Sequence, residues 1–366
     1  MVIENRYYSD LAIPPGEYLN EVLASKGMAQ TELARRIGRP IQAINEIIKG
    51  EKAITPATAI QLERALDVPA HIWTGLEARY QLIRARQEER THLKKELPHL
   101  KNIPYKQLAD LGCVNRSRDK EFKVRELQSF YGVSSLENLP EIRAYEASFR
   151  CGAAGQASNY ALAAWIRCAE LRAVSVSAES FDKRKLRESL EPIRGLCTKD
   201  PSEFVTELKQ ILARCGVVLV LLPHFPKTYA HGATFWIKPD KAVLLMSLRG
   251  RWADIFWFSV FHELGHILLH KKRTFIDSER ISPELRDQER EADAFAAQSL
   301  IPGASFNEFV RKGEFDRAAI ERFAREIGVT AGIVIGRLQH EGRVAPGSAL
   351  NRLRERYEWQ EGKASP

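Results

Sequence analysis

The feature that most constrains this chain is a pair of histidines, His262 and His266, in the sequence HELGH. On a helix, residues four apart lie on one face about one turn apart, so both imidazoles can bind one metal ion. Glu263 lies between them and is placed to take a proton from a water molecule at that metal. Because a catalytic zinc uses three protein ligands and keeps one position for water, Glu289 is the natural third ligand. This spacing predicts a hydrolytic His-His-Glu site.

The alternative is a helix that carries two histidines by chance. Against it, the apolar run Trp252–Phe261 predicts a buried helix, in which imidazoles and a carboxylate need partners or a metal. Asp293 lies four residues after Glu289 and shares its helix face, so we expect it to hold a ligand in position. Glu291 falls on the opposite face and is the less suitable ligand. His270, one turn after the HELGH sequence, is either a supporting or substrate-facing residue or an ordinary hydrogen-bonded histidine.

Composition favours a globular protein of two or three domains, since the chain has 366 residues, 44% of them hydrophobic and 28% charged. The most apolar segment, Trp252–His270, is interrupted by acidic residues and histidines, so it is typical of a protein core and not of a membrane span. The N-terminus lacks a signal-peptide pattern. Five cysteines without C-x-x-C spacing indicate reduced thiols. We therefore expect a cytoplasmic protein that does not interact with membranes.

The distribution of charge is more informative than the net charge of +8. Residues 1–90 contain as many basic as acidic residues. Within them, residues 26–52 hold six basic and three acidic side chains. Global basicity is thus weak support for nucleic-acid binding, and this local cluster is better support.

The basic cluster coincides with a helix-turn-helix pattern. Apolar residues recur at helical spacing in Gln30–Gly38 and again in Ile41–Lys49, with a glycine and a proline between the two segments. In such a unit the second helix lies in the major groove, where Gln and Asn read adenine and Arg reads guanine or phosphate. The alternative is a small bundle that contacts protein. The residues that we predict to contact DNA are Thr31, Arg39, Gln42, Ala43, Asn45 and Glu46.

The flanking residues make the N-terminal segment resemble the HigA-type antitoxin branch of the lambda-repressor-like helix-turn-helix proteins. The resemblance covers about residues 13–82 and implies that Thr55 and Pro56 cap the fourth helix and that residues 73–80 pack on the bundle. The turn contains Arg39 and Pro40 where that family more often has a small polar pair. The residues that carry the resemblance are the runs PPGEYL from Pro14, ITPATA from Ile54, LERAL from Leu62 and WTGL from Trp73, with Tyr80.

Residues 83–200 are predicted to be a helical connector or spacer. Amphipathic helices are expected at Ile103–Leu111, Glu121–Tyr131 and Tyr160–Ser175, with a break at Cys151–Gly155. This region is a spacer, a dimerisation element or the N-terminal part of the following domain.

Strand patterns follow at Val217–Leu222, Gly232–Lys238 and Ala242–Ser247. They predict a sheet of two or three strands directly before the HELGH helix. An edge strand in this position can pair with an extended substrate, or the sheet simply covers the helix. Tyr229, His231 and Arg249 are the candidates for stabilising an oxyanion.

The second half of the chain resembles the ImmA/IrrE family of metallopeptidases. The resemblance implies zinc on His262, His266 and Glu289, with Glu263 as general base and acid. It also implies an intracellular role in which a helix-turn-helix repressor is cleaved or antagonised. The residues that carry it are GATFW from Gly232, the strand at 242–247, Arg249 and Gly250, FWFSVFHELGHILLH from Phe256, Ile276 and Asp277, EREADAFAA from Glu289, LIP from Leu300, and Ile320–His340.

These patterns together predict a multidomain, mainly α protein with a small β-sheet. We expect an all-α helix-turn-helix bundle at 13–82, the helical middle region at 83–200, an α+β zincin-like metallopeptidase domain at 201–343, and a mobile tail at 344–366. The predicted function is a regulatory zinc endopeptidase that binds operator DNA and cleaves a specific protein, expected to be a helix-turn-helix repressor. By analogy with symmetric operators, a homodimer is expected. The alternative is a DNA-binding, antitoxin-like regulator whose metal domain acts as a sensor or interaction module.

Overall fold

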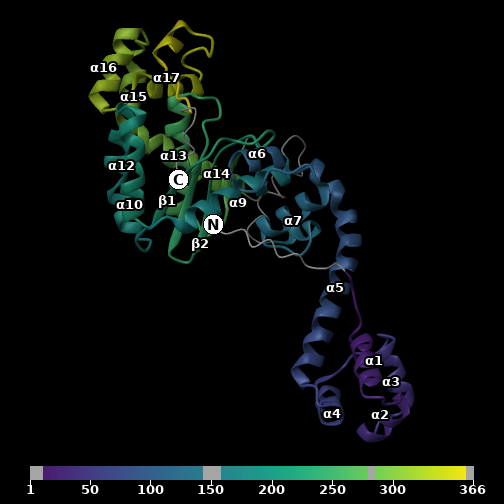
Figure 1. Ribbon diagram of the computed structural model, residues 1–366. Coiled ribbons are helices and arrows are strands. Elements are labelled where there is room, and N and C mark those ends of the chain that lie inside the picture. Colours follow the sequence, from purple (N-terminus) through teal and green to yellow (C-terminus); the bar gives the residue numbers. More distant parts are fainter. Residues whose placement is uncertain (1–10, 143–157, 279–284, 360–366) are drawn as a thin grey trace. The chain divides into compact units, whose positions relative to one another are not determined.

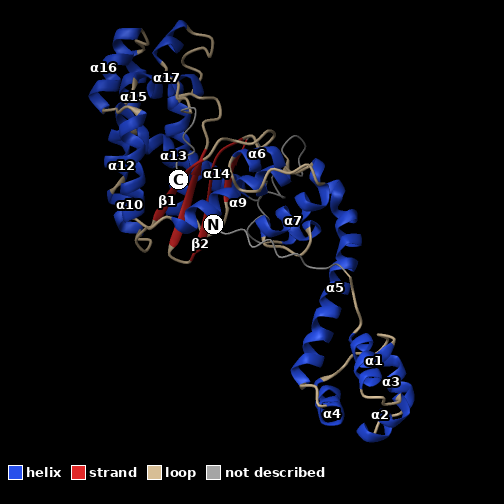
Figure 2. Cartoon of the chain, in the orientation of Figure 1, coloured by secondary structure: helices blue, strands red, loops and turns tan. Residues whose placement is uncertain are grey.

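A computed structural model describes residues 11–142, 158–278 and 285–359 of the chain (Figure 1). The chain divides into two compact units, Met1–Lys95 and Glu96–Pro366, each of which is described by itself. Figure 2 shows that the described residues are mostly helical, with a small sheet in the second unit, which confirms the predicted fold class. The predicted break at Cys151–Gly155 and the tail residues 360–366 lie outside the described residues.

The first unit is a helical bundle built around a compact apolar core. Its helices are α1 (Pro15–Ser25), α2 (Gln30–Ile37), α3 (Ile41–Ile48), α4 (Pro56–Leu66) and α5 (Ala70–Glu96). The two helices of the predicted helix-turn-helix thus end within one residue of their expected limits. Gly38 ends α2 in the left-handed conformation, with φ of 65°. The Thr55 side chain caps α4 by accepting a hydrogen bond from the Thr58 amide, as the resemblance implied.

The helices that follow belong to the same compact unit as the sheet. They are α6 (Tyr105–Asp110), α7 (Lys120–Tyr131), α9 (Asn159–Ser175), α10 (Lys183–Glu188), α11 (Leu190–Gly195) and α12 (Pro201–Arg214), with short 3-10 turns at Leu97–Lys101, Leu136–Glu141 and Leu196–Thr198. The expected boundary at residue 82 falls inside α5, which continues to Glu96. Helix α9 contacts β1, β2 and β3, and residues 96–366 form one compact unit. The alternative in which the middle region belongs to the following domain therefore fits the structure best.

The sheet has four strands among the described residues, in the order β1-β3-β2-β4. They are β1 (Val217–Leu221), β2 (Ala230–Lys238), β3 (Lys241–Met246) and β4 (Phe275–Ser278). Strand β1 is parallel to β3, whereas β2 is antiparallel to both β3 and β4. Of the three strands that precede the HELGH helix, β1 is at one edge of the sheet, whereas β2 and β3 are internal. Strand β4, which follows the helix in sequence, pairs with β2 and forms the other edge. The strand directly before the helix is therefore already paired on both sides.

The HELGH helix, α13 (Ala253–Leu269), is at the centre of the second unit. It contacts β2, β3 and β4 as well as the helices α14 (Arg286–Leu300) and α17 (Ala331–His340), while α15 (Gly303–Lys312) and α16 (Arg317–Ile327) complete the helical layer. Trp257, Phe261 and Leu264 are fully buried in this core. In the part of the chain that the structure describes, no helix combines the length and apolar character needed to cross a membrane.

Part of the segment that was expected to be a tail packs against the rest of the second unit. Residues 349–357, which we call the C-terminal strap, include a 3-10 turn (Ala349–Leu353) and pack on the start of α13. Arg354 forms a buried ion pair with Asp254 at 2.7 Å. Tyr357 is 6% exposed, and its hydroxyl accepts a hydrogen bond from the Trp257 indole at 3.0 Å. These isolated anchors lie in a charged segment, so hydrophobic periodicity does not reveal them.

Candidate metal centre

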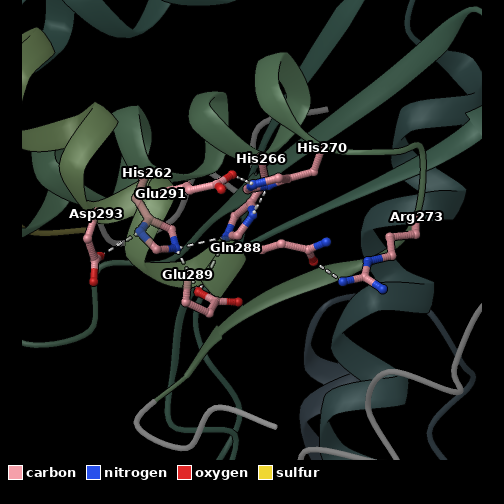
Figure 3. A network of polar contacts seen from close by, with 8 residues as sticks. All are labelled: His262, His266, His270, Arg273, Gln288, Glu289, Glu291 and Asp293. Carbon is pink, nitrogen blue, oxygen red and sulfur yellow. Dashed lines mark hydrogen bonds and ion pairs between the residues drawn. The ribbon is translucent and has the colours of Figure 1, made fainter. Parts of the chain in front are cut away.

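Three side chains from two packed helices converge on one point (Figure 3). His262 and His266 project from α13, and their Nε2 atoms are 2.9 Å apart. Glu289 comes from α14, and its Oε2 atom lies 3.1 Å from His262 Nε2 and 3.4 Å from His266 Nε2. All three residues are buried. The structure thus brings the three predicted ligands together.

The arrangement of these three atoms fits a divalent metal such as zinc. Zinc bonds to imidazole nitrogen and carboxylate oxygen are about 2.0–2.2 Å long, so ligand atoms of a tetrahedral site lie roughly 3.3–3.5 Å apart. The three observed separations are within a few tenths of an ångström of this value. A set of two histidines and one glutamate leaves one position of a four-coordinate zinc to water, which is typical of a catalytic site.

Each imidazole has a further partner on its other ring nitrogen, as Figure 3 shows. The Asp293 carboxylate lies 2.9 Å from His262 Nδ1. On the other side, His270 Nδ1 lies 3.0 Å from His266 Nδ1, and His270 Nε2 lies 3.0 Å from the Glu291 carboxylate. Asp293 and His270 are therefore located where a supporting role requires them. Glu291, which we had placed only on the face away from the ligands, contacts the site through His270.

Burial and local charge set the protonation of the ligands. Burial by itself would raise the pKa of Glu289, but hydrogen bonds and charge from His262 and His266 outweigh it and lower this pKa to about 2. Burial lowers the pKa of His266 below its ordinary value. An ionised glutamate and a neutral imidazole are the forms that bind a metal ion.

Close packing around two glycines positions the other residues of the site. Glu263 is fully buried on α13 beneath β2. A Cβ atom at Gly232 of β2 would lie 2.9 Å from the Glu263 Cγ, so glycine makes room for this side chain. A Cβ atom at Gly265 would lie 3.3 Å from the Ala292 Cα, which indicates how closely α14 approaches α13. Phe275 of β4 stacks on the His266 imidazole, with ring centroids 4.1 Å apart.

The three oxyanion candidates form a cluster at the start of β2. The Arg249 guanidinium donates a hydrogen bond to the Tyr229 carbonyl at 3.0 Å and lies 3.3 Å from His231 Nε2. It also lies over the Tyr229 ring, 5.3 Å from the ring centroid. Tyr229 has a φ of 52°, a left-handed conformation that is uncommon for a tyrosine. The oxyanion role of these residues stays a prediction.

The predicted DNA-contacting residues divide into exposed and buried ones. Thr31, Gln42 and Asn45 are exposed, whereas Arg39 and Glu46 are half-buried. Ala43 differs from the other predicted contact residues in being buried. This residue is 6% exposed and lies one helical turn before the buried Ile47, so its side chain faces the core.

Side-chain contacts organise this exposed face. The Arg39 guanidinium donates to the Gln61 side chain of α4 at 2.7 Å, which holds it at the turn. Glu46 accepts hydrogen bonds from Gln42 at 3.1 Å and from Lys52 at 3.2 Å. Amide, guanidinium and carboxylate groups are therefore presented side by side on and near α3.

Comparison with known proteins matches both units of the chain. The model of the IrrE N-terminal-like domain matches residues 249–339, which include all three candidate ligands and Glu263. The helix-turn-helix model matches residues 19–73, which include the whole candidate DNA-contacting face. Each match covers the residues that its site requires.

Similar proteins were found for the N-terminal part. The chain is 33% identical over 81 residues to virulence-associated protein I of Dichelobacter nodosus, which corresponds to 22% of this chain and 75% of that protein. Among solved structures, a putative antidote protein of a plasmid maintenance system from Nostoc punctiforme is 29% identical, with 23% of this chain and 91% of that chain covered and a TM-score of 0.22. The Pseudomonas aeruginosa antitoxin HigA with higBA promoter is 29% identical, with 24% and 95% covered and a TM-score of 0.22.

Proposed function

Because the chain belongs to the helix-turn-helix family at its N-terminus and carries an IrrE-like peptidase domain at its C-terminus, we propose that it is a zinc-dependent endopeptidase that acts in transcription regulation. The observation that carries this proposal is the convergence of His262, His266 and Glu289 on one point with Glu263 buried beside them. A structural metal site has no need of a carboxylate between its histidine ligands.

In the proposed mechanism of peptide hydrolysis, each residue of the site has a separate role. When bound at His262, His266 and Glu289, zinc supplies Lewis-acid polarisation of the scissile carbonyl and acidifies water. The Glu263 carboxylate takes a proton from the attacking water and returns it to the nitrogen of the leaving amine. Asp293 holds the His262 ring by accepting its Nδ1 proton, which directs the Nε2 lone pair toward the metal position. Burial of Glu263 excludes bulk water from this proton transfer.

In the proposal, the N-terminal unit binds operator DNA through α2 and α3. Gln42 and Asn45 are the base-reading candidates, because both are exposed on α3 and both amides can pair bidentately with adenine. The basic residues near them supply phosphate contacts. Replacement of both by alanine is expected to abolish specific retardation of a fragment of the protein's own promoter. The Gln81→Ala variant, changed at an exposed position of α5, is the control, and undiminished binding by the double variant would exclude this face.

The proposed substrate is a helix-turn-helix repressor, and the proposed DNA-bound form is a homodimer. Association with an operator would bring the peptidase to a repressor bound at the same promoter, which restricts cleavage to few proteins. A second candidate is a DNA-binding regulator whose metal domain senses a signal or binds a partner without cleaving it. The match of the helix-turn-helix model to residues 19–73 supports DNA binding in both candidates.

The Glu263→Gln variant separates the two candidates. It keeps all three ligands, so zinc content is expected to be unchanged, while hydrolysis falls by a factor of roughly a thousand or more because the proton acceptor is lost. Cells that produce the wild type, this variant or Glu308→Gln are compared for new protein N-termini. Glu308→Gln is the control, because it changes an exposed glutamate of α15. The proposal requires cleavage products with the wild type and the control only. Equal regulation and equal N-termini in all three would favour the sensor candidate.

A further inference from the structure

Two cysteines far apart in sequence meet outside the metal centre. Cys113 follows α6, and Cys168 lies on α9, 55 residues later, yet their Sγ atoms are 3.0 Å apart. Both are free thiols. We propose that Cys113 and Cys168 form a redox-active dithiol, which a hydroperoxide such as hydrogen peroxide converts reversibly to a disulfide.

Formation of this disulfide requires only a small movement of the two sulfur atoms. A disulfide brings the sulfur atoms to about 2.05 Å, so they must approach by roughly 1 Å. Cys168 is fully buried within a helix and is held in place by its surroundings. Cys113 lies in the connection between α6 and α7, directly after Gly112, which has a φ of 72°. The Cys113 amide donates a hydrogen bond to the Leu108 carbonyl at the end of α6, so the approach is expected to come mainly from rotation of the Cys113 side chain.

The two thiols differ in the way that an attacking and a resolving cysteine should. Cys113 is half-buried, whereas Cys168 has no exposed surface. The hydrogen bond from Cys168 lowers the pKa of Cys113 against the opposing effect of burial, and the charge of Arg172 acts in the same direction. The same hydrogen bond and burial raise the pKa of Cys168. Cys113 is therefore the more exposed residue of the pair and the thiol that forms a thiolate first.

The oxidation proceeds in two balanced steps. The Cys113 thiolate attacks one peroxide oxygen, so an S–O bond forms, the O–O bond breaks, and the hydroxide that leaves takes a proton to give water. Cys168 then attacks the Cys113 sulfenic acid. The S–S bond forms, the S–O bond breaks, and the Cys168 proton leaves with the hydroxide as a second water. Two thiols are oxidised, and one peroxide is reduced.

The disulfide would join two parts of the second unit. One is the connection between α6 and α7, and the other is α9, which packs on β1, β2 and β3. Because the bond closes a long loop, it restricts the unfolded chain and stabilises the unit. The oxidised protein is expected to unfold at a temperature roughly 5–10 °C higher than the reduced protein.

The test is carried out on the reduced, full-length protein. It is treated with a stoichiometric amount of hydrogen peroxide, its remaining thiols are alkylated, and its peptides are mapped by mass spectrometry. The expected main product is one cross-linked peptide pair containing Cys113 and Cys168, which a dithiol reagent reverses. The Cys168→Ala variant should instead stop at a Cys113 sulfenic acid that dimedone labels.

The control is Cys197→Ser, which changes a buried thiol outside the pair and should still form the disulfide. The thermal unfolding of each reduced variant is measured first, and the wild-type map decides the question if a variant does not fold. Oxidation of Cys197 or Cys215 at the same rate as Cys113 would overturn the proposal. A predominant cross-link that uses any other cysteine, or that joins two chains, would overturn it as well.

Discussion

At the scale of single residues, the candidate metal centre depends on the contacts that each imidazole makes through its other ring nitrogen. If an imidazole rotates freely before the metal binds, part of the free energy of binding is lost in restricting that rotation. Asp293 contacts His262 where it would restrict this rotation, and His270 with Glu291 lies where the two would restrict that of His266. Phe275 adds a stacked aromatic surface against the second ring. Affinity for the metal should therefore respond to residues that do not touch it.

We predict that Asp293→Ala lowers zinc affinity by about 10- to 100-fold without unfolding the protein, because His262 loses the acceptor that fixes its orientation. Competition with a chromophoric chelator measures this change. Asp287→Ala is the matched control, because Asp287 lies on the same helix and pairs with the exposed Arg290. Equal affinity of the wild type and the Asp293 variant would show that the carboxylate does not support the ligand.

Residue spacing predicted which side chains cluster at the candidate metal site, but it did not predict all of the residues that contact them. His262, Glu263 and His266 follow from the period of one helix, and Glu289 with Asp293 from the period of another. The contact between Glu291 and His270 depends on the rotation of α14 against α13, which spacing within either helix does not determine. Ala43 illustrates the same limit. Spacing alone does not determine whether a small residue at the edge of the apolar face of a short helix is buried or exposed.

At the scale of helices and strands, contacts between elements depend on small residues at a few points. Helix α1 meets the end of α3 at Gly16, where a Cβ atom would lie 2.2 Å from the Ile47 carbonyl oxygen and 2.3 Å from the Ile48 Cα. Both of these atoms are backbone, so a side chain at this position cannot be accommodated by a rotamer change. The position of the candidate recognition helix is thus linked to this one glycine.

We predict that Gly16→Ala destabilises the first unit by about 2 kcal/mol or more, since α1 and α3 must move apart. Gly75→Ala is the matched control. Gly75 lies inside α5, and a Cβ atom there meets nothing within 4 Å, so alanine should stabilise the helix by about 0.5–1 kcal/mol. Urea unfolding followed by circular dichroism measures both changes. A neutral Gly16→Ala variant would mean that the two helices separate without cost.

The C-terminal strap provides a prediction with a defined pH range. Burial raises the pKa of Tyr357 to about 12, although the hydrogen bond from Trp257 opposes this, and the ordinary value is 10.0. The folded state therefore favours the neutral hydroxyl. The stability due to this neutral form is fully present below pH 10 and is lost as the pH rises toward 12, by up to about 1.4 kcal/mol per pH unit.

The Tyr357→Phe variant should be less stable by about 1 kcal/mol below pH 10, because it lacks the hydrogen bond with Trp257. Above pH 10 its free energy of unfolding should fall less steeply than that of the wild type. Urea unfolding between about pH 8 and pH 11.5 compares the two slopes. Tyr18→Phe, at a more exposed tyrosine of the first unit, should keep the wild-type slope. Parallel curves for Tyr357→Phe and the wild type would contradict the prediction.

The elements differ in how well sequence patterns predict them. The helices at 30–37 and 41–48 and the strands at 217–221, 230–238 and 241–246 follow from periodicity and from their bounding glycines and prolines. Strand β4 has only four residues and gains its stability from pairing with β2, so its own sequence carries little signal. The strap is fixed by Arg354 and Tyr357, whose partners lie about a hundred residues earlier.

At the scale of the whole molecule, the chain consists of two compact units with separate cores. The core of the first contains Leu19, Ile44 and Trp73, and that of the second contains Trp257 and Phe261. Residues 201–343, which we predicted as a domain, share their unit with the preceding helices from Glu96 onward. Contacts of α9 with the sheet produce this arrangement, and no pattern within α9 indicates which partner it packs against.

The second unit holds the candidate metal site, and this leads to a prediction about chelation. A ligand stabilises the unit that binds it by RT ln(1 + [L]/Kd), which is about 4 kcal/mol when free zinc exceeds its Kd a thousandfold. Removal of zinc should therefore lower the unfolding temperature of the second unit by roughly 10 °C and leave that of the first unchanged. Scanning calorimetry of the full chain, with and without chelator, measures both transitions. Gly16→Ala should shift only the other transition, which assigns the two peaks. DNA affinity should change by less than about twofold on chelation, and a larger change would show that zinc occupancy and DNA binding are coupled.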